Sequence, residues 1–334
     1  MIWDTETVRR SIEQYLVRQP ACAKSFAVSP AGIEPAVERV VEVLIHSRFR
    51  RGPKPDGERR EAIARKVRYY VRRSRPVRLT LGFGPTKNLN ATDKNRAEWA
   101  EAFALHQMAR LDAAVQEIYP PALHVRIVCD DALVRRVNGV PRWMTREYMA
   151  SLRDLVSRLE LDYLIKAVIP LSRYHPLLHL GLCFQRAKRR VLRWEADPAN
   201  SQAIAEMDRH AFKNLLPTPD LSDGERWERA RRASHEYRLY WEALELSCIP
   251  RLQRPLMTLY SGERGLLRIY SLCKGNISQP WQGEGGLRPN DKGELVPFVL
   301  TQERKDTYQT QWVNGLRIAG GLLDRIRIVQ PDTA

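Results

Sequence analysis

The middle of the chain alternates short β-rich runs with long helical patterns, and this order most restricts the fold. The β-rich runs are Val77–Phe83, His124–Cys129 and Tyr163–Ile169, and the helical patterns between them are Arg96–Ile118 and Thr145–Leu159. Strands that alternate with helices in this way form a parallel sheet through right-handed crossovers. The sequence therefore predicts an α/β fold with a Rossmann-like, mostly parallel sheet flanked by helices.

The segments on either side of this alternation have a different character. Helical patterns occupy Glu6–Arg18, Glu34–Ile45 and Glu58–Arg73 before the first strand, and Glu225–Cys248 after a polar, proline-containing connection at Asp197–Pro219. We therefore expect an N-terminal helical segment at residues 1–74 and a Rossmann-like core at 75–250.

Beyond Pro250 the chain carries strand-like runs separated by glycine-rich turns. These runs are Leu256–Tyr260, Leu266–Leu272 and Leu295–Leu300. They predict that residues 251–334 form a C-terminal antiparallel β extension packed on the core.

Composition excludes several classes of protein. With 334 residues, 43% of them hydrophobic, the chain can bury a sizeable core. No apolar run approaches the roughly 18–20 residues of a membrane span, and no signal peptide is visible at Met1–Asp4. The five cysteines are scattered, and His175 and His179 lack the Glu of a metalloprotease helix, so neither a disulfide framework nor a metal site is expected. We expect a cytoplasmic protein without a membrane partner.

The net charge of +16 is concentrated in one segment. Arg48–Arg78 contains 13 Lys and Arg against three acids, a net of +10, and a smaller basic cluster lies at Arg186–Arg193. Three interpretations stay open: a solvated arginine-rich helix, a site for phosphorylated small molecules, or a nucleic-acid surface. The third lacks any zinc-finger or RNA-recognition signature.

Polar segments follow each of the three central strands. Since ligands of open α/β sheets bind at the carboxyl ends of the strands, these segments are the candidate site. Ordinary turn chemistry is the alternative explanation for any one of these residues. The residues concerned are Lys87, Asn88, Asn90, Asp130, Asp131 and Arg173.

Glu101 lies on the core-facing stripe of the long helix at Arg96–Ile118. The stripe runs through Met108 and Val115, and extending it backwards reaches Glu101. A buried carboxylate needs a partner, and Lys87 is the candidate because it lies in the loop that enters this helix. The alternative is a surface Glu that complements the helix dipole. We expect replacement of Lys87 to leave stability nearly unchanged, because it lies in a loop.

The stretch from Leu79 to Leu152 resembles the isocyanide synthase family, the PvcA-type enzymes that include the yeast dityrosine spore-wall protein. The resemblance rests on Pro85-x-Lys87-Asn88-x-Asn90, Ala100-Glu101-x-x-Ala104-Leu105, Ile118-Tyr119-Pro120-Pro121 and Asp130-Asp131. The C-terminal third is compatible, with Ile249-Pro250, Leu266–Leu272, Pro280-Trp281 and Asp291-Lys-Gly293 in the family order. The resemblance therefore covers most of Leu79–Leu300.

The chain departs from the family pattern at four positions. Asn88 stands where the family has Ser, and Asp131 where it has Gly. Tyr260 and Gln282 stand where histidines are expected. These departures indicate a divergent member with another substrate or a changed outcome.

The resemblance implies an enzyme of natural-product biosynthesis without a metal or redox cofactor. Such an enzyme joins the amine of an amino acid, aromatic or other, to the carbonyl of ribulose 5-phosphate and delivers that carbon as an isonitrile. The catalytic candidates are then Lys87, Glu101, Asp130 and Asp131, with Lys87 either gripping the phosphate or forming a Schiff base. The substrate-binding candidates are Asn88, Asn90, Arg173, Arg268, Lys274, Trp281 and Gln282.

Two other functions remain open at this point: a basic nucleic-acid- or polyanion-binding protein, and a family scaffold with changed chemistry. Acids beside the basic loop residues favour a small phosphorylated substrate, because they would repel a nucleic-acid backbone. The amino acid substrate and the oligomeric state, including a homodimer, stay open.

Overall fold

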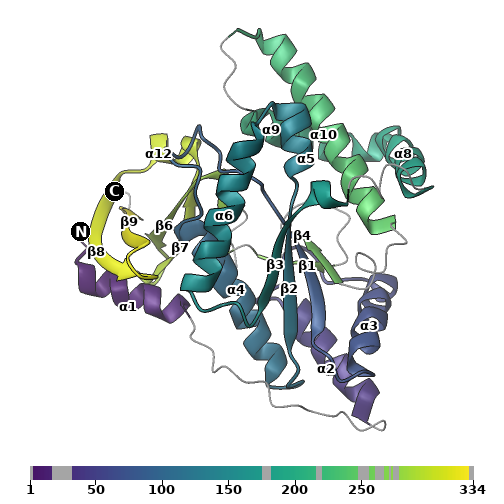
Figure 1. The fold of residues 1–334 in the computed structure, drawn as a ribbon, viewed down its shortest axis with the longest axis horizontal. Coiled ribbons are helices and arrows are strands. Elements are labelled where there is room, and N and C mark those ends of the chain that lie inside the picture. Colours follow the sequence, from purple (N-terminus) through teal and green to yellow (C-terminus); the bar gives the residue numbers. More distant parts are fainter. Residues whose placement is uncertain are drawn as a thin grey trace.

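The computed structural model describes residues 3–16, 32–174, 182–215, 220–246, 256–259, 267–270, 272–273 and 278–330. Its centre is a parallel sheet with the strand order β3-β2-β1-β4-β5 (Figure 1). The strands are β1 (Val77–Phe83), β2 (Leu123–Cys129), β3 (Ile165–Pro170), β4 (Leu256–Leu259) and β5 (Leu267–Arg268). The predicted Rossmann-like α/β fold is confirmed.

The first three strands lie close to where the sequence placed them. β1 has the predicted bounds, and it pairs with β2 from Val77 opposite Leu123 to Phe83 opposite Cys129. These strands are rich in Val, Ile and Leu because both faces of the sheet are covered by helices.

The C-terminal strands correct the prediction in part. We expected Leu256–Tyr260 and Leu266–Leu272 in the antiparallel extension, but β4 pairs parallel to β1, and β5 pairs parallel to β4, in the central sheet. The extension is a second, mixed sheet in the order β7-β6-β9-β8, with β6 and β9 parallel. Its strands are β6 (Glu284–Pro289), β7 (Leu295–Leu300), β8 (Thr310–Ile318) and β9 (Leu323–Val329). The domain boundaries stay a prediction.

Helices cover both sheets and the edge where the central strands end. Figure 1 shows α2 and α3 on the opposite side of the central sheet from the C-terminal sheet, and α1 beside β8. Each helix that the sequence predicted is present, with bounds that agree with the prediction within a few residues. The helices are α1 (Thr5–Tyr15), α2 (Ile33–Ile45), α3 (Gly57–Val71), α4 (Trp99–Gln116), α5 (Asp131–Asn138), α6 (Arg142–Arg158), α8 (Leu182–Glu195), α9 (Ser201–Asn214), α10 (Asp223–Leu246) and α12 (Gln302–Thr307), with short 3-10 helices η2 (Leu171–Arg173), η3 (Pro198–Asn200) and η4 (Pro280–Gln282).

The expected connection at Asp197–Pro219 is wrong over most of its length, because α9 occupies Ser201–Asn214. No proline lies within α9, and Pro198 precedes it in η3, where the missing N–H costs nothing. The helix packs on α10.

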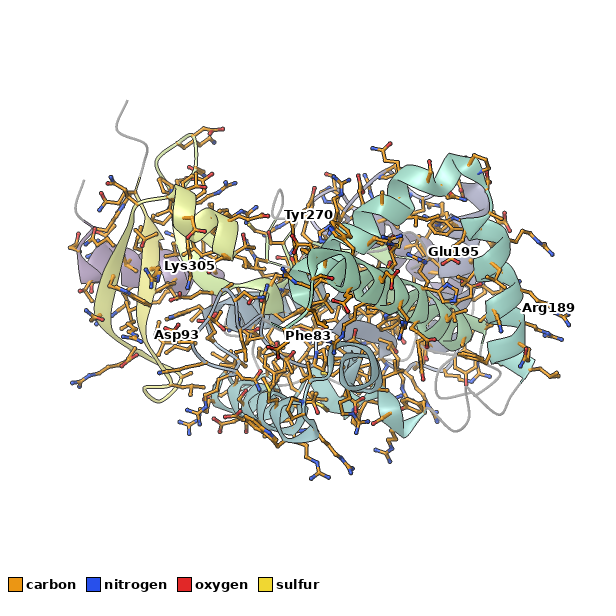
Figure 2. All side chains as sticks on the ribbon, turned by 90° about the horizontal axis from the view of Figure 1, so that it is seen from above. Phe83, Asp93, Arg189, Glu195, Tyr270 and Lys305 are labelled. Carbon is orange, nitrogen blue, oxygen red and sulfur yellow. The ribbon has the colours of Figure 1, made fainter. Side chains whose placement is uncertain are left out.

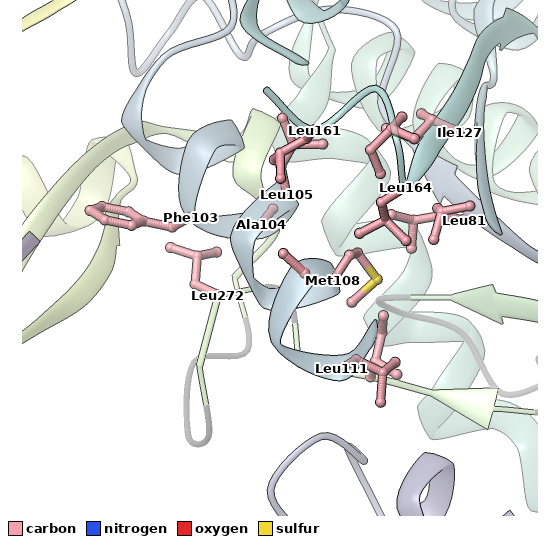
Figure 3. Close-up of a cluster of buried hydrophobic side chains, with 14 of the residues drawn as sticks. Leu81, Phe103, Ala104, Leu105, Met108, Leu111, Ile127, Leu161, Leu164 and Leu272 are labelled. Atoms are coloured by element: carbon pink, nitrogen blue, oxygen red, sulfur yellow. The ribbon is translucent and has the colours of Figure 1, made fainter. Parts of the chain in front are cut away.

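α4 is buried on almost all sides, because it lies between the two sheets. Figure 3 shows Met108 directed toward Leu81 and Leu164, whereas Phe103 points the other way, toward Leu272. α4 also contacts β6 and β7 of the C-terminal sheet. A helix with a single buried stripe was expected; the second sheet buries the other side as well.

A separate hydrophobic cluster joins α10 to the carboxyl ends of β2 and β3. Tyr240 and Trp241 of α10 pack in it with Val128 of β2 and Ile169 of β3. α10 therefore covers the edge at which the sheet strands end.

The basic segment is partly neutralised by its own neighbours. Arg60 of α3 pairs with Glu38 and Glu42 of α2, and Arg68 pairs with Glu34 and Glu61. Among the residues described, no helix combines the length and apolarity needed to cross a membrane.

Candidate active site

The segments after the central strands meet at one edge of the sheet, as predicted. The backbone N–H of Asp130 donates to the carbonyl of Phe83, 3.3 Å away, so the ends of β1 and β2 are joined. Ser172 of η2 donates from its backbone N to Asp131 Oδ1 at 2.9 Å and from its hydroxyl to Oδ2 at 2.7 Å. Figure 2 shows Phe83 near the middle of the molecule, between the α8–α10 side and the C-terminal sheet.

Lys87 lies beside this edge in a fully enclosed position. Its Nζ is 2.9 Å from Glu98 Oε1 and 3.1 Å from Glu101 Oε1. It also donates to the carbonyls of Pro280, at 3.0 Å, and Gly283, at 2.7 Å. The pairing of Lys87 with Glu101 that the sequence predicted is confirmed, and the same ammonium joins the central sheet to the segment before β6.

The carboxylates around Lys87 are held by further donors. Glu101 accepts from the Tyr148 hydroxyl at 2.8 Å and from the Glu98 backbone N at 2.9 Å. Glu98 accepts from the backbone N of Gly285 at 2.7 Å, where a Cβ would overlap the backbone of Ala100. We call Lys87, Glu98, Glu101 and Tyr148 the lysine cluster.

Burial and charge act against each other in the lysine cluster. Burial alone would lower the pKa of Lys87, but the charges of Glu101 and Glu98 raise it above its ordinary value. Burial raises the pKa of Glu101 to about 7 against the opposing charge of Lys87. The cluster is a compact, desolvated ion group.

These contacts correct the expectation for Lys87. Its side chain is 0% exposed, and its three N–H bonds face four acceptor groups. No N–H is left over for a substrate phosphate. The expectation that Lys87 contributes little to the core is wrong, because the chain folds the loop beneath the second sheet.

Sequence reasoning missed Glu98 and Tyr148 as members of the lysine cluster. Glu98 and Glu101 form a capping box at the start of α4, and their spacing of three residues was the available signal. Nothing in the sequence around Tyr148 shows that its hydroxyl reaches a carboxylate from another helix.

The two asparagines hold their loop against other elements. The backbone N of Asn88 donates to the carbonyl of Trp281 at 2.8 Å, and Asn88 Oδ1 accepts from the Asn90 backbone at 3.1 Å. The Asn90 amide donates to the carbonyl of Leu215, just beyond α9, at 3.4 Å. Their predicted role in substrate binding stays a prediction.

Trp281 and Gln282 lie at the same edge, in η4. The Trp281 ring centroid is 4.9 Å from that of Phe83, and Gly84 leaves the room this contact needs, because a Cβ there would overlap the indole. Gln282 accepts from the backbone N of Gln279 at 2.9 Å.

Of the three predicted phosphate-binding cations, Arg173 is the one whose side chain the structure describes. Arg173 is exposed at the end of η2. Arg268 lies in β5, and its side chain is not among those described. Lys274, Tyr260, His175 and His179 lie outside the described residues.

Asp130 differs from every other acid at this edge. It is 7% exposed, and its Oδ1 is buried without a hydrogen-bond partner. Burial, together with the neighbouring charge of Asp131, raises the pKa of its carboxyl to about 7, although a hydrogen bond with its own backbone N–H acts in the opposite direction. A buried carboxyl that has one oxygen without a hydrogen-bond partner and a pKa of about 7 is suited to proton transfer.

Comparisons with known proteins agree with this geometry. A model of the pyoverdine/dityrosine biosynthesis protein family matches residues 67–245, more than half of the chain. The crystal structure of the PvcA protein from Pseudomonas aeruginosa superimposes with a TM-score of 0.69 at 14% identity. That likeness covers 87% of this chain and 99% of the other, and it shows a shared fold. No curated protein matches the chain. The family predicted from the motifs is thus confirmed: the chain belongs to the pyoverdine/dityrosine biosynthesis protein family, a family of biosynthetic enzymes that act on small molecules.

Proposed function

We propose that this protein is an isocyanide synthase-like enzyme that condenses the amine of an amino acid with ribulose 5-phosphate. Family membership and the motifs from Pro85 to Asp131 support this reaction class. The product is an isonitrile or a related one-carbon imine derivative.

The observation that carries the proposal is the buried Asp130 carboxyl at the end of β2, whose Oδ1 has no hydrogen-bond partner. Imine formation first requires a proton to leave the substrate ammonium, so that the neutral amine can attack the ketone carbon. A proton must then reach the hydroxyl of the carbinolamine, which departs as water. One carboxyl with a pKa of about 7 can accept the first proton and return the second at neutral pH.

Other residues of the edge have supporting roles in this proposal. Asp131 orients the segment after β3 through Ser172, and the lysine cluster fixes the loop after β1 without touching substrate. Arg173, Arg268 and Lys274 remain candidates for the phosphate, with Arg173 as the exposed cation of η2. A Schiff base on Lys87 would have to break its contacts to both Glu98 and Glu101.

The test is incubation with the twenty amino acids and ribulose 5-phosphate labelled with ¹³C at the ketone carbon. Mass spectrometry should find a product that has gained one carbon and lost two hydrogens, with the label retained. Asp130→Asn should lower the rate by about 10²-fold or more, as loss of a general acid–base group does. Asp154→Asn, on the exposed side of α6, is the matched control. No labelled product with any amino acid contradicts the proposal.

A further inference from the structure

The C-terminal sheet has an outer face that carries arginines stacked on aromatic rings. Leu287 of β6 and Val299 of β7 are buried in the main core with residues of α4. Because successive side chains of a strand point to opposite sides, Arg288 and Phe298 project from the other side of the sheet, which we call the outer face. α12 packs against β7 and adds Arg304 to this face.

Phe298 holds two guanidinium groups. The Cζ atoms of Arg288 and Arg304 lie 4.7 and 4.5 Å from the centroid of its ring. Arg304 also donates to Ser278 Oγ at 2.9 Å and to the Val299 carbonyl at 2.8 Å. A guanidinium that is stacked on a ring is held there by the attraction of its charge for the ring's electrons. Two like charges are therefore fixed at one aromatic ring.

A second pair of arginines, at Trp312, differs in its charge balance. The Cζ atoms of Arg325 and Arg327 lie 4.7 and 4.3 Å from the centroid of the six-membered or five-membered system of that indole. Arg327 Nε is 3.1 Å from Glu284 Oε2, so a carboxylate offsets the charge of one member of this pair. The same carboxylate is 2.8 Å from Lys305 Nζ.

The pair at Phe298 has no such acid. Among the residues that the structure describes, neither Arg288 nor Arg304 forms an ion pair with a carboxylate. Glu303, the acid that acts on the charge of Arg304, is itself paired with Lys213. Burial and the charge of Arg288 lower the pKa of Arg304, which shows that the two guanidinium groups disfavour each other's charge. An anion bound between them would relieve this repulsion.

The exposure and the chemistry of the pair indicate which anion it fits. Arg288 is exposed and Arg304 is half-buried, whereas Phe298 beneath them is 3% exposed, so solvent reaches the guanidinium groups and not the ring. The planar N–H groups of a guanidinium match the oxygens of phosphate and carboxylate groups. Two positive charges match the nearly double charge of a phosphate monoester better than the single charge of a phosphodiester or a carboxylate.

We propose that Arg288 and Arg304 form a binding site for the phosphate group of a phosphomonoester, with Phe298 as the platform that holds both guanidinium groups. The site lies on the C-terminal sheet and shares no residue with the candidate site at the carboxyl edge of the central sheet. It does not depend on the proposed reaction.

The test is calorimetric titration of the intact chain at low salt and pH 8. The probes are inorganic phosphate, phenyl phosphate and dimethyl phosphate. At this pH the first two are dianions, whereas the diester keeps a single charge. We expect both dianions to bind at least about tenfold more tightly than dimethyl phosphate, as charge-assisted hydrogen bonds to two guanidinium groups provide.

The variants assign this preference to the pair at Phe298. Arg288→Gln removes the charge of an exposed side chain, so the fold should be retained, and it should weaken binding of both dianions about tenfold or more. Arg304→Lys keeps the charge but removes the planar group, and it should weaken the dianions as well. Arg325→Gln, which removes an exposed arginine stacked on Trp312, is the matched control and should change Kd by less than about twofold.

Three results would overturn the site. The first is equal affinity for the dianions and the diester. The second is an equal loss in Arg288→Gln and Arg325→Gln, which would show a response to net charge alone. The third is binding that Arg288→Gln leaves unchanged and Arg173→Gln removes, which would place the phosphate at the edge of the central sheet.

Two further measurements separate this site from the other proposals. Tighter binding of a single-stranded DNA oligonucleotide than of phenyl phosphate, with a steep salt dependence, would identify the outer face as a nucleic-acid surface and reject the phosphomonoester site. The labelled-product assay tests the proposed reaction independently, because the site is accepted or rejected on the Kd values whether or not labelled product forms.

Discussion

The lysine cluster and the end of β2 both contain buried carboxyl groups, but the two regions differ in how fully the carboxyl oxygens are hydrogen-bonded. In the lysine cluster, Glu101 accepts from Lys87, Tyr148 and the backbone, and Glu98 accepts from Lys87 and Gly285. At the end of β2, the Asp130 carboxyl has one oxygen without any partner. Both regions are desolvated, so burial alone does not explain the difference.

This comparison distinguishes the carboxylates of the lysine cluster, which stabilise the fold, from the Asp130 carboxyl, which is available for chemistry. A satisfied ion cluster gains rigidity from every contact, and here those contacts connect the central sheet to η4 and β6. An unsatisfied carboxyl costs free energy in the folded state. We infer that such a cost is retained at Asp130 because a ligand or a proton transfer uses the free oxygen.

The largest expected effect is on the lysine cluster. Lys87→Met keeps the aliphatic stem and removes the ammonium, which leaves the buried Glu101 and the partly buried Glu98 without their counter-ion. Removing one partner of a buried ion group costs about 3–5 kcal/mol of unfolding free energy. Urea denaturation should show this loss. Lys213→Met, which removes a surface lysine paired with Glu303, is the control and should change stability by about 1 kcal/mol or less. Comparable small losses in both variants would mean that the cluster is not a structural centre.

An intermediate effect is expected at Asp131, the neighbour of Asp130. Asp131→Ala leaves the Ser172 backbone N and hydroxyl without their acceptors, at a cost of about 1–3 kcal/mol. The comparison variant is Asp154→Ala, which removes an exposed pair with Arg158 and should have little effect. Thermal unfolding measures both. If Asp131→Ala does not change stability, then Asp131 is not a structural carboxylate, and its proposed difference from Asp130 is wrong.

The smallest effect is expected on the basic segment. Arg65 is exposed on α3, so Arg65→Gln should change unfolding free energy by no more than about 0.5 kcal/mol and leave turnover unchanged. Retention on heparin should also fall only slightly, since neighbouring Arg60 and Arg68 are engaged by acids of α2 and α3. Tight, steeply salt-dependent binding of DNA that depends on this segment would instead support the polyanion-binding alternative.

Local sequence patterns were sufficient to predict the central strands, their parallel pairing and one contact of the candidate site. Val77–Phe83 is a short β-rich run that alternates with long helical patterns, so β1 and its parallel pairing with β2 followed from the sequence. The contact between Lys87 and Glu101 also followed, because the loop that leaves β1 leads directly into α4. By contrast, β5 has two residues, too few for a pattern to show that it extends the parallel sheet.

The candidate site was harder to predict than the fold. Asp130 and Asp131 are adjacent residues of the same type, so the sequence does not distinguish them. The structure shows that Ser172 donates hydrogen bonds to both carboxyl oxygens of Asp131 and to neither oxygen of Asp130.

The most direct test of the account is the pH dependence of stability in Asp130→Asn compared with the parent protein. The folded carboxyl has a pKa of about 7 and its ordinary value is 3.8, so between these values the folded chain binds more protons than the unfolded chain. The parent therefore loses stability as pH rises through this window, by about 1.4 kcal/mol per pH unit at most, whereas the variant does not. We predict that urea denaturation finds Asp130→Asn equal to the parent near pH 4 and more stable by about 2–4 kcal/mol at pH 8. Its turnover should be lower than that of the parent by about 10²-fold or more. A variant that is less stable than the parent at pH 8, with a difference that does not change between pH 4 and pH 8, would show that Asp130 is an ordinary paired carboxylate and would contradict the account.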